Sequence, residues 1–133
     1  RGLPGVISLV AELDNQIVGH ILFSPIHIET SGGEVPAISL APLAVRPGYQ
    51  NQGIGAELTH CGLGACKEQG HRIAIVLGHP NYYPRFGFSA ALAKPLGCPW
   101  GDCGEAWMAL ELIPGSLKAV SGKVIFPDAF QNV

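Results

Sequence analysis

The chain has 133 residues, of which 47% are hydrophobic and 14% are charged, and its formal net charge at pH 7 is -2. These proportions are typical of a folded globular protein and not of a disordered segment. A nucleic-acid partner is disfavoured, because phosphate backbones are bound mainly by clustered Lys and Arg, and these residues are scattered here. No apolar run approaches the roughly 20 residues that cross a bilayer, and the first residues lack a signal-peptide pattern. We therefore expect one cytoplasmic domain over residues 1–133 without a membrane partner.

Three strands are predicted in the first third of the chain. Residues 6–13 and 16–29 flank an Asp-Asn turn, which predicts a β-hairpin. Residues 35–45 follow a Gly-rich turn and are expected to form a third strand. Pro42 interrupts that strand, and it needs a free edge or a bulge because proline has no N–H to donate.

A helix and a further strand follow. Apolar residues recur at helical spacing between residues 53 and 69, while Gly62 weakens this helix and Gly70 ends it. Residues 73–77 are apolar on both alternating faces, as expected for a strand that is covered on both sides. The third strand, the helix and this strand therefore predict a parallel β-α-β unit with a right-handed crossover.

The last part of the chain predicts short elements around a long loop. Residues 82–86 are expected to form a short helix or turn, and residues 106–112 a strand. Residues 90–105 are rich in Pro and Gly and predict a long loop, of the kind that often shapes a binding site. The expected fold class is α/β (α+β), with a mixed, largely antiparallel sheet and one parallel β-α-β unit.

Four cysteines raise the question of a metal site or a disulfide. Neither Cys61 with Cys66 nor Cys98 with Cys103 has the two-residue gap of zinc knuckles, so no metal is expected and reduced thiols are the default. Cys98 and Cys103 could close a small ring if they were oxidised. A structural disulfide is nevertheless not expected in a cytosolic chain.

The loop between the third strand and the helix has the parts of an anion site. Glycine permits positive φ and close approach of ligand oxygens, and the first turn of a helix presents unpaired N–H groups at the positive end of its dipole. A Walker loop is disfavoured because no Lys follows, and a dinucleotide fingerprint because Leu58 stands where its third glycine would be. The N–H groups would come from Gln52, Gly53, Ile54, Gly55 and Ala56.

The order Gln50-x-x-Gly53-x-Gly55 after Leu43-Ala44-Val45 resembles the acetyl-CoA signature of the GNAT superfamily of N-acetyltransferases. The wider sequence resembles its YhbS-like branch, with further matching segments in the expected order at residues 17–20, 41–45, 76–78, 82–88 and 108–112. This resemblance implies a GNAT fold, acetyl-CoA as co-substrate, and transfer of the acetyl group to a primary amine by direct attack. The acceptor amine, whether a small molecule or a protein, stays open.

The resemblance also implies which residues bind acetyl-CoA. Backbone groups of Leu43 and Val45 would pair with the pantetheine amides, and Arg46 is preferred over Arg85 as the positive charge beside the CoA phosphates. The full expected set is Leu43, Ala44, Val45, Arg46, Gln50, Asn51, Gln52, Gly53, Ile54, Gly55, Ala56, Asn81, Tyr82 and Phe86.

Two catalytic residues are expected. Tyr83 is the candidate proton donor for the departing thiolate, because the superfamily tyrosine stands four residues before the Gly of a Gly-Phe pair, here Gly87. The alternative is that Tyr82 and Tyr83 are packing aromatics. His79 is the candidate general base, since it follows the second strand of the parallel unit, at the end where open sheets bind ligands. The alternatives are His20, Glu105 and a chain of water molecules.

The sequence differs from the family pattern at its N-terminus. Family members normally begin with a further strand and one or two helices, which this chain is expected to lack. Without that strand one edge of the sheet would be free to pair with another chain. We therefore expect a homodimer or strand exchange. Two other classes of function stay open, an acyl-CoA-binding module without turnover and a truncated interaction protein.

Overall fold

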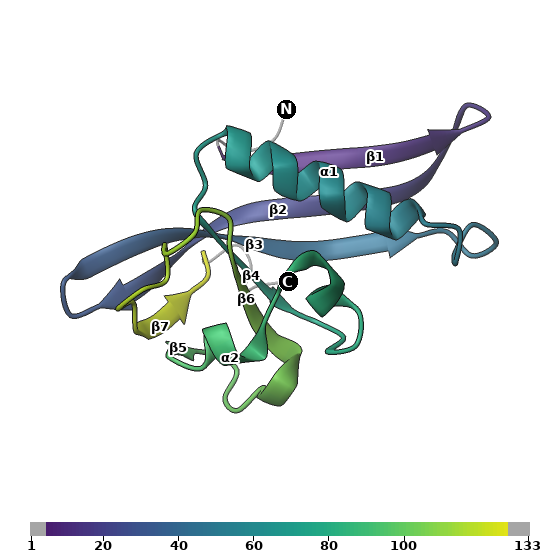
Figure 1. Cartoon of the computed structure of the whole chain (residues 1–133). Helices are drawn as coiled ribbons and strands as arrows, with labels where there is room; N and C mark the ends of the chain where they lie inside the picture. The colour runs from purple at the N-terminus through teal and green to yellow at the C-terminus, as the bar shows by residue number, and fades with distance from the viewer. Residues whose placement is uncertain (1–4, 128–133) are drawn as a thin grey trace.

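The computed structural model describes residues 5–127, which form a seven-stranded mixed sheet curled into a half-barrel (Figure 1). The strand order is β5-β7-β2-β3-β4-β6, with β1 paired to β2 outside this path. β3 pairs with β4, and β5 with β7, in parallel, while the other pairs are antiparallel. The elements in chain order are β1 (Ile7–Leu13), β2 (Gln16–Thr30), β3 (Gly33–Val45), α1 (Ile54–Glu68), β4 (Ile73–Leu77), η1 (Tyr83–Phe86), α2 (Ala90–Ala93), β5 (Leu96–Gly97), η2 (Gly104–Ala106), β6 (Trp107–Glu111) and β7 (Gly122–Ile125).

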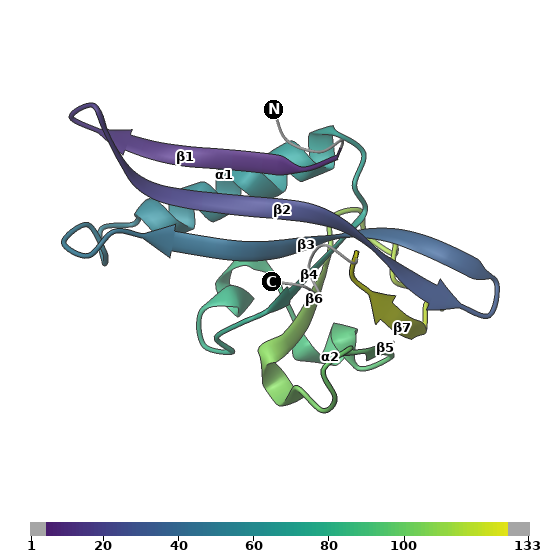
Figure 2. The ribbon, with the colours of Figure 1, turned by 180° about the vertical axis from the view of Figure 1, so that it is seen from behind.

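The predicted hairpin is confirmed in β1 and β2. Asp14 and Asn15 have positive φ angles of 51° and 65°, as a two-residue turn that follows the twist of its strands requires. β1 pairs with the first half of β2, up to Phe23, whereas β7 pairs with residues 27–29 of the second half. β2 therefore carries two different neighbours along one edge, and the sheet bends around it (Figure 2).

Pro42 lies at a bulge, as its lack of an N–H predicts. Ile21 faces Leu43 and Phe23 faces Leu40, so β3 fits one more residue than β2 into this interval. The peptide bond between Ala41 and Pro42 is cis. The extra residue absorbs the proline without the loss of a regular ladder hydrogen bond.

β3 and β4 separate soon after they meet. Their parallel register consists of two pairs, Ile38 with Ala74 and Ser39 with Ile75, within the described chain. Beyond Ser39, β3 continues to Val45 beside β2 alone, and β4 runs away from it toward η1 (Figure 1). We call the space between residues 40–45 of β3 and residues 76–77 of β4 the β3–β4 gap. Its β3 side has backbone groups that β4 does not use.

Hydrophobic residues pack on both faces of the sheet. α1 covers one face, where Phe23, Ile38 and Leu63 belong to one buried cluster, and Ile28, Ile75 and Trp107 belong to the cluster on the other face. The predicted helix and the predicted strand at residues 73–77 are thus confirmed. Gly62, which by propensity weakens α1, is explained by this packing, because a Cβ at this position would overlap the ring of Phe23.

The region expected to be one long loop contains regular structure. α2 begins after Ser89, whose hydroxyl accepts a hydrogen bond of 3.3 Å from the Leu92 N–H, and β5 pairs with β7 through Leu96 and Gly122. The expectation of a loop over residues 90–105 is therefore wrong in part. These elements are short, and β5 depends on a partner strand distant in sequence, so local patterns do not indicate it. The predicted strand at residues 106–112 is confirmed as β6.

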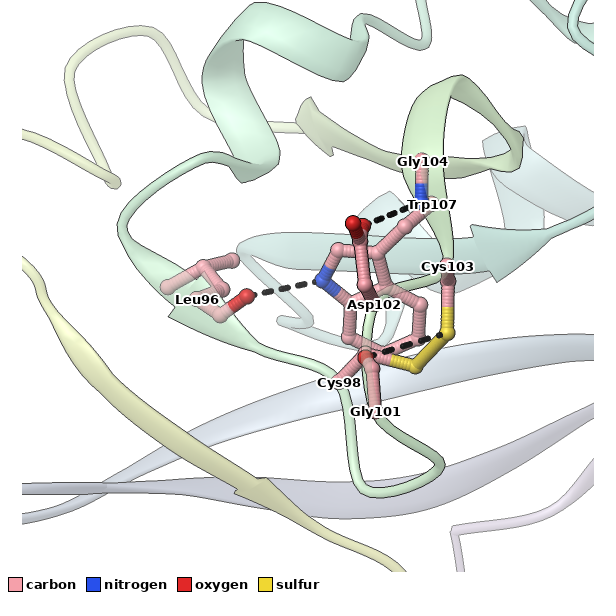
Figure 3. Close-up of a disulfide and its surroundings, with 7 residues drawn as sticks. All are labelled: Leu96, Cys98, Gly101, Asp102, Cys103, Gly104 and Trp107. Atoms are coloured by element: carbon pink, nitrogen blue, oxygen red, sulfur yellow. Dashed lines mark hydrogen bonds between the residues drawn. A yellow bond between two sulfur atoms is a disulfide. The ribbon is translucent and has the colours of Figure 1, made fainter.

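Cys98 and Cys103 form a disulfide (Figure 3). The expectation of reduced thiols is wrong for this pair, because the turn between them brings their ends together: Gly101 has a φ of 95° and donates a hydrogen bond of 3.3 Å to the Cys98 carbonyl. Cys61 is an exposed thiol, and burial raises the pKa of the Cys66 thiol to about 12.

Among residues 5–127, no three His, Cys, Asp or Glu side chains are grouped to hold a metal ion. No helix in the same range is long and apolar enough to cross a membrane.

Candidate active site

A cavity of about 750 Å³ lies at the N-terminal end of α1, between the end of β3 and η1. We call it the α1 cavity, and it opens beside the β3–β4 gap. Its lining combines the strand end, the loop before α1, the first turn of α1, and the segment that follows β4. The lining residues are Leu43, Val45, Tyr49, Gln50, Asn51, Gly53, Ile54, Gly55, Ala56, His79, Tyr82 and Arg85.

The loop before α1 is shaped by residues with left-handed backbone. Gly48, Asn51 and Gly53 have φ angles of 92°, 63° and 86°, and Gly53 is the residue that caps α1. The first intrahelical hydrogen bond runs from the Glu57 N–H to the Gly53 carbonyl at 2.9 Å. The N–H groups of Ile54, Gly55 and Ala56 precede the first intrahelical donor, so they have no partner within the helix and form the positive end of its dipole. Such an arrangement of backbone N–H groups is suited to bind an anion, and we call it the backbone anion site.

Side chains of the loop hold it in place. The Gln50 side chain donates a hydrogen bond of 2.9 Å to the Val45 carbonyl, and the Gln52 side chain donates one of 3.2 Å to the Gly48 carbonyl. The Tyr49 N–H donates to the Arg46 carbonyl at 3.0 Å. Both glutamines thus bond to the backbone of their own loop, which fixes its shape before any ligand arrives.

Tyr82 and Arg85 form the opposite wall of the α1 cavity. The Tyr82 hydroxyl lies 3.0 Å from the position that a Cβ on Gly55 would occupy. The Arg85 guanidinium lies 4.4 Å from the centre of the Tyr82 ring, and its Nε donates a hydrogen bond of 2.8 Å to the Tyr82 carbonyl. Arg85 therefore brings a positive charge to the same cavity that the N-terminus of α1 lines, and both features favour an anionic ligand.

Tyr83 lies behind Tyr82, outside the set of residues that line the α1 cavity. Its ring packs edge-on against Phe88 and leaves no room for a Cβ on Gly78. Burial raises the pKa of the Tyr83 phenol, and the neighbouring Tyr82 raises it further. His79 does line the cavity, is exposed, and accepts hydrogen bonds on its carbonyl from the N–H groups of Tyr82 and Tyr83 at 3.1 and 3.3 Å.

Several residues expected at the site lie elsewhere. The Arg46 guanidinium turns to the β1–β2 hairpin, where it donates hydrogen bonds of 3.4 Å to the Gln16 side chain and to the Ile17 carbonyl. His20 is hydrogen-bonded to the Ser8 hydroxyl at 3.1 Å on the same hairpin. Glu105 belongs to η2, beyond the far edge of β4. The remaining expected residues outside the lining are Ala44, Gln52, Asn81 and Phe86.

Tyr49 lines the α1 cavity although it is not among the residues expected there. Arg85, the less preferred of the two expected arginines, lines the cavity as well, and Arg46 does not. The sequence does contain a signal that could identify Tyr49 as a site residue, because it is an aromatic residue within the Gly-rich loop before α1. For the arginines, the sequence shows which residue is nearer to the loop. It does not show which way a side chain turns.

Comparison with known proteins adds independent evidence. Residues 5–91 match the Acetyltransferase (GNAT) domain family. The chain belongs to the GNAT acetyltransferase family. A curated relative, the uncharacterized N-acetyltransferase YhbS of Escherichia coli K12, is 34% identical over 127 residues, which are 95% of this chain and 75% of that protein. A second, the uncharacterized N-acetyltransferase YjhQ of the same strain, is 40% identical over 82 residues, 62% of this chain and 45% of that protein.

Two solved GNAT structures resemble the present one. The crystal structure of YhbS from Escherichia coli in complex with CoA matches with a TM-score of 0.84 at 34% identity, over 93% of this chain and 68% of that chain. A GNAT acetyltransferase from Brucella melitensis in complex with acetyl-CoA matches with a TM-score of 0.72 at 36% identity, over 92% of this chain and 67% of that chain. The resemblance to the GNAT superfamily and the expected fold class are confirmed, and the chain falls in the acyltransferase class of enzymes.

Proposed function

We propose that this GNAT chain transfers the acetyl group of acetyl-CoA to a primary amine. The observation that carries the proposal is the β3–β4 gap opening onto the backbone anion site at the start of α1. A gap bordered by unpaired strand backbone accommodates a chain of amides, and a helix N-terminus accommodates a diphosphate. Pantetheine and diphosphate are joined in this order in coenzyme A. The related GNAT structures with CoA and with acetyl-CoA bound support the proposal that this chain binds acetyl-CoA.

Each part of the donor has a proposed contact. The diphosphate lies against the N–H groups at residues 53–56, with Arg85 opposite. The pantetheine amides pair with backbone groups of Leu43 and Val45, both of which line the α1 cavity. Gln50 and Gln52 act indirectly by holding the loop, because their side chains already bond to its carbonyls.

The proposed reaction is a direct attack. The lone pair of a neutral amine forms a bond to the thioester carbonyl carbon, and the C–S bond then breaks to leave an amide and a thiolate. His79, exposed at the cavity, receives the proton that the nitrogen loses, and Tyr83 gives a proton to the thiolate. A phenol is protonated at neutral pH and can therefore give up a proton, while burial raises the pKa of Tyr83 and makes it a weaker acid. Tyr82 is the competing donor, because its ring lines the cavity.

Binding without turnover is the second candidate function, and the position of Tyr83 outside the cavity lining favours it. Isothermal titration with acetyl-CoA, followed by a thiol-release assay over pooled primary amines, separates the candidates. We expect heat of binding and release of free thiol with at least one amine. Binding without thiol release from any amine would leave a binding module, and no heat at all would remove both functions.

We also propose a cytoplasmic location and a homodimer. The dimer is supported by β1, which pairs with β2 alone among the strands of residues 5–127, and beside which Val10, Leu13 and Ile17 are 52%, 44% and 55% exposed. Light scattering across a concentration series tests it. A constant monomer mass at all concentrations would remove the dimer.

A further inference from the structure

We propose that Cys98 and Cys103 form a reversible thiol–disulfide switch that holds η1, and with it Tyr83, in place when the disulfide is closed. This inference rests on the proposed function, because it concerns the regulation of the proposed acid of that reaction. The structure shows the closed state (Figure 3). We expect reduction to loosen η1 and to slow acetyl transfer, so that oxidation activates the enzyme.

The disulfide links the end of β5 to the start of η2. Cys98 directly follows Gly97, the last residue of β5, and Cys103 is the residue that caps η2. The Trp107 indole N–H joins the same two segments, because it donates a hydrogen bond of 2.8 Å to the Leu96 carbonyl (Figure 3). Opening the disulfide therefore leaves η2 attached to β5 by non-covalent contacts alone.

η2 is connected in turn to the end of β4. The Gly78 N–H donates a hydrogen bond of 2.9 Å to the Ala106 carbonyl. This bond follows the pair of Leu77 with Trp107, which is the last pair at this end of β4 and β6. Hydrogen bonds at the end of a strand pair open more readily than those in its middle. How often the bond of Gly78 opens therefore depends on how firmly η2 is held.

Gly78 and the residue after it support η1. A Cβ on Gly78 would lie 2.5 Å from Cε2 of Tyr83, so the tyrosine ring lies directly against the backbone of this glycine. The carbonyl of His79 accepts hydrogen bonds from the N–H groups of Tyr82 and Tyr83 at 3.1 and 3.3 Å. A shift of residues 78–79 would therefore move both tyrosines.

The loop closed by the disulfide also keeps its shape through hydrogen bonds. The Gly101 N–H donates to the Cys98 carbonyl at 3.3 Å, and the Gly104 N–H donates to the Asp102 side chain at 3.0 Å. A Cys103 thiol would have an acceptor in the Gly101 carbonyl, whose oxygen lies 3.6 Å from its sulfur. These contacts would keep the two sulfurs near each other after reduction, so the bond can form again.

The pair has the access and the setting of a redox-active disulfide. Both cysteines are half-buried and line a cavity of about 370 Å³, from which a thiolate can reach them. A disulfide that closes so short a loop contributes less to global stability than one that closes a long loop. In the proposed cytoplasmic location, disulfides are usually transient and serve catalysis or redox sensing. These properties favour a switch over a structural brace.

The switch exchanges two electrons and two protons with a dithiol. A thiolate of the dithiol attacks one cysteine sulfur, the S–S bond breaks, and the other cysteine leaves as a thiolate that takes up a proton. The second thiol of the dithiol then attacks the mixed disulfide and releases the first cysteine. The dithiol ends as a disulfide and the chain as two thiols. A disulfide oxidant reverses both steps.

The test compares the oxidised and the reduced parent chain, prepared with oxidised glutathione and with dithiothreitol. The amide product is measured by mass spectrometry, because a reductant interferes with the detection of released thiol. We expect reduction to lower kcat by about 10- to 100-fold, since a displacement of about 1 Å near a catalytic group has effects of this size. The Kd for acetyl-CoA should not change, because the backbone anion site lies on α1.

Variants without the switch serve as controls. The double variant Cys98→Ser, Cys103→Ser should show the low kcat of the reduced parent under both conditions. Cys61→Ser, which removes an exposed thiol from α1, should respond to reduction as the parent does. The two tryptophans of the chain, Trp100 and Trp107, lie in and beside the loop, so fluorescence follows its redox state. Should the double variant not fold, the reduced parent supplies the same comparison.

A ¹⁵N NMR spectrum of each redox state tests the connection without the reaction. We expect reduction to shift the amides of Gly78, His79, Tyr82 and Tyr83 together with those of residues 97–106. Shifts confined to residues 97–106, an equal kcat in the two states, or a disulfide that dithiothreitol does not reduce in the folded chain would overturn the inference. If no amine is acetylated in either state, the proposed function fails, and the amide shifts decide the switch.

Discussion

The Tyr82 hydroxyl and Gly55 face each other across the first turn of α1, with 3.0 Å between the hydroxyl and the place of a Cβ on the glycine. The Tyr82 hydroxyl therefore leaves little room for a side chain at position 55, beside the backbone anion site. It also explains why a glycine stands in a helical position where alanine has the better propensity.

Gly55→Ala should therefore weaken acetyl-CoA binding without unfolding the chain. The added methyl group meets the Tyr82 hydroxyl and narrows the mouth of the anion site, and we expect Kd to rise about tenfold by calorimetry, equivalent to about 1.4 kcal/mol. Gly64→Ala is the matched control, because nothing lies within 4 Å of a Cβ there. The control should keep its affinity, and an equal loss in both variants would contradict the assignment.

Gly62→Ala should destabilise the fold. Its Cβ overlaps the buried Phe23 ring, so α1 or the ring must shift, at a cost of about 1–3 kcal/mol in the free energy of unfolding. Urea denaturation of the variant and the parent protein measures this loss of unfolding free energy. Gly64→Ala in the same helix should instead gain about 0.5–1 kcal/mol, because alanine loses less backbone entropy than glycine. A neutral Gly62→Ala would show that the ring is not held against α1.

Arg85→Gln should reduce acetyl-CoA affinity, whereas Arg46→Gln should not. Only the first guanidinium lines the α1 cavity, and the second is bonded to the β1–β2 hairpin. An exposed charge contact is worth about 1 kcal/mol, or about a fivefold change in Kd, and raising the salt concentration should shrink the difference. The reverse order of effects would return the phosphate contact to Arg46.

Tyr83→Phe should abolish thiol release while acetyl-CoA still binds, and Tyr82→Phe should retain turnover. If instead Tyr82→Phe alone loses turnover, the acid is Tyr82. Each variant loses one tyrosine hydroxyl, Tyr83 from the first residue of η1 and Tyr82 from the residue that caps it. A loss of turnover caused by disturbed packing of this segment would therefore appear in both variants.

The raised pKa of Tyr83 also predicts the pH dependence of stability. A phenol whose pKa is higher in the folded than in the unfolded chain contributes stability that is complete below the unfolded value and is lost as pH rises through the folded one. Unfolding free energies measured on the alkaline side of the ordinary tyrosine pKa should therefore fall with pH. The fall should be smaller in Tyr83→Phe, and an identical fall in both proteins would contradict a shifted Tyr83.

The parallel unit and its loop were predictable because their signals are local. The helical spacing from Ile54, the buried run at residues 73–77 and the glycines before α1 are all contiguous in the sequence. The bulge at Pro42 follows from the chemistry of one residue.

The parts that sequence reasoning missed depend on tertiary contacts. β5 has two residues and exists because β7 lies beside it, and the Cys98–Cys103 bond depends on a turn whose closure the spacing alone does not indicate. The direction of the Arg46 side chain is set by a hairpin far from it in the chain. Such features require the fold to be known.

The most direct measurement is an NMR titration of the ¹⁵N-labelled chain with acetyl-CoA. The largest shifts should appear at the amides of Gly53, Ile54, Gly55 and Ala56, with a second group at Leu43 and Val45. Saturable binding that leaves the amides of residues 53–56 unmoved would contradict the placement of the diphosphate at the start of α1.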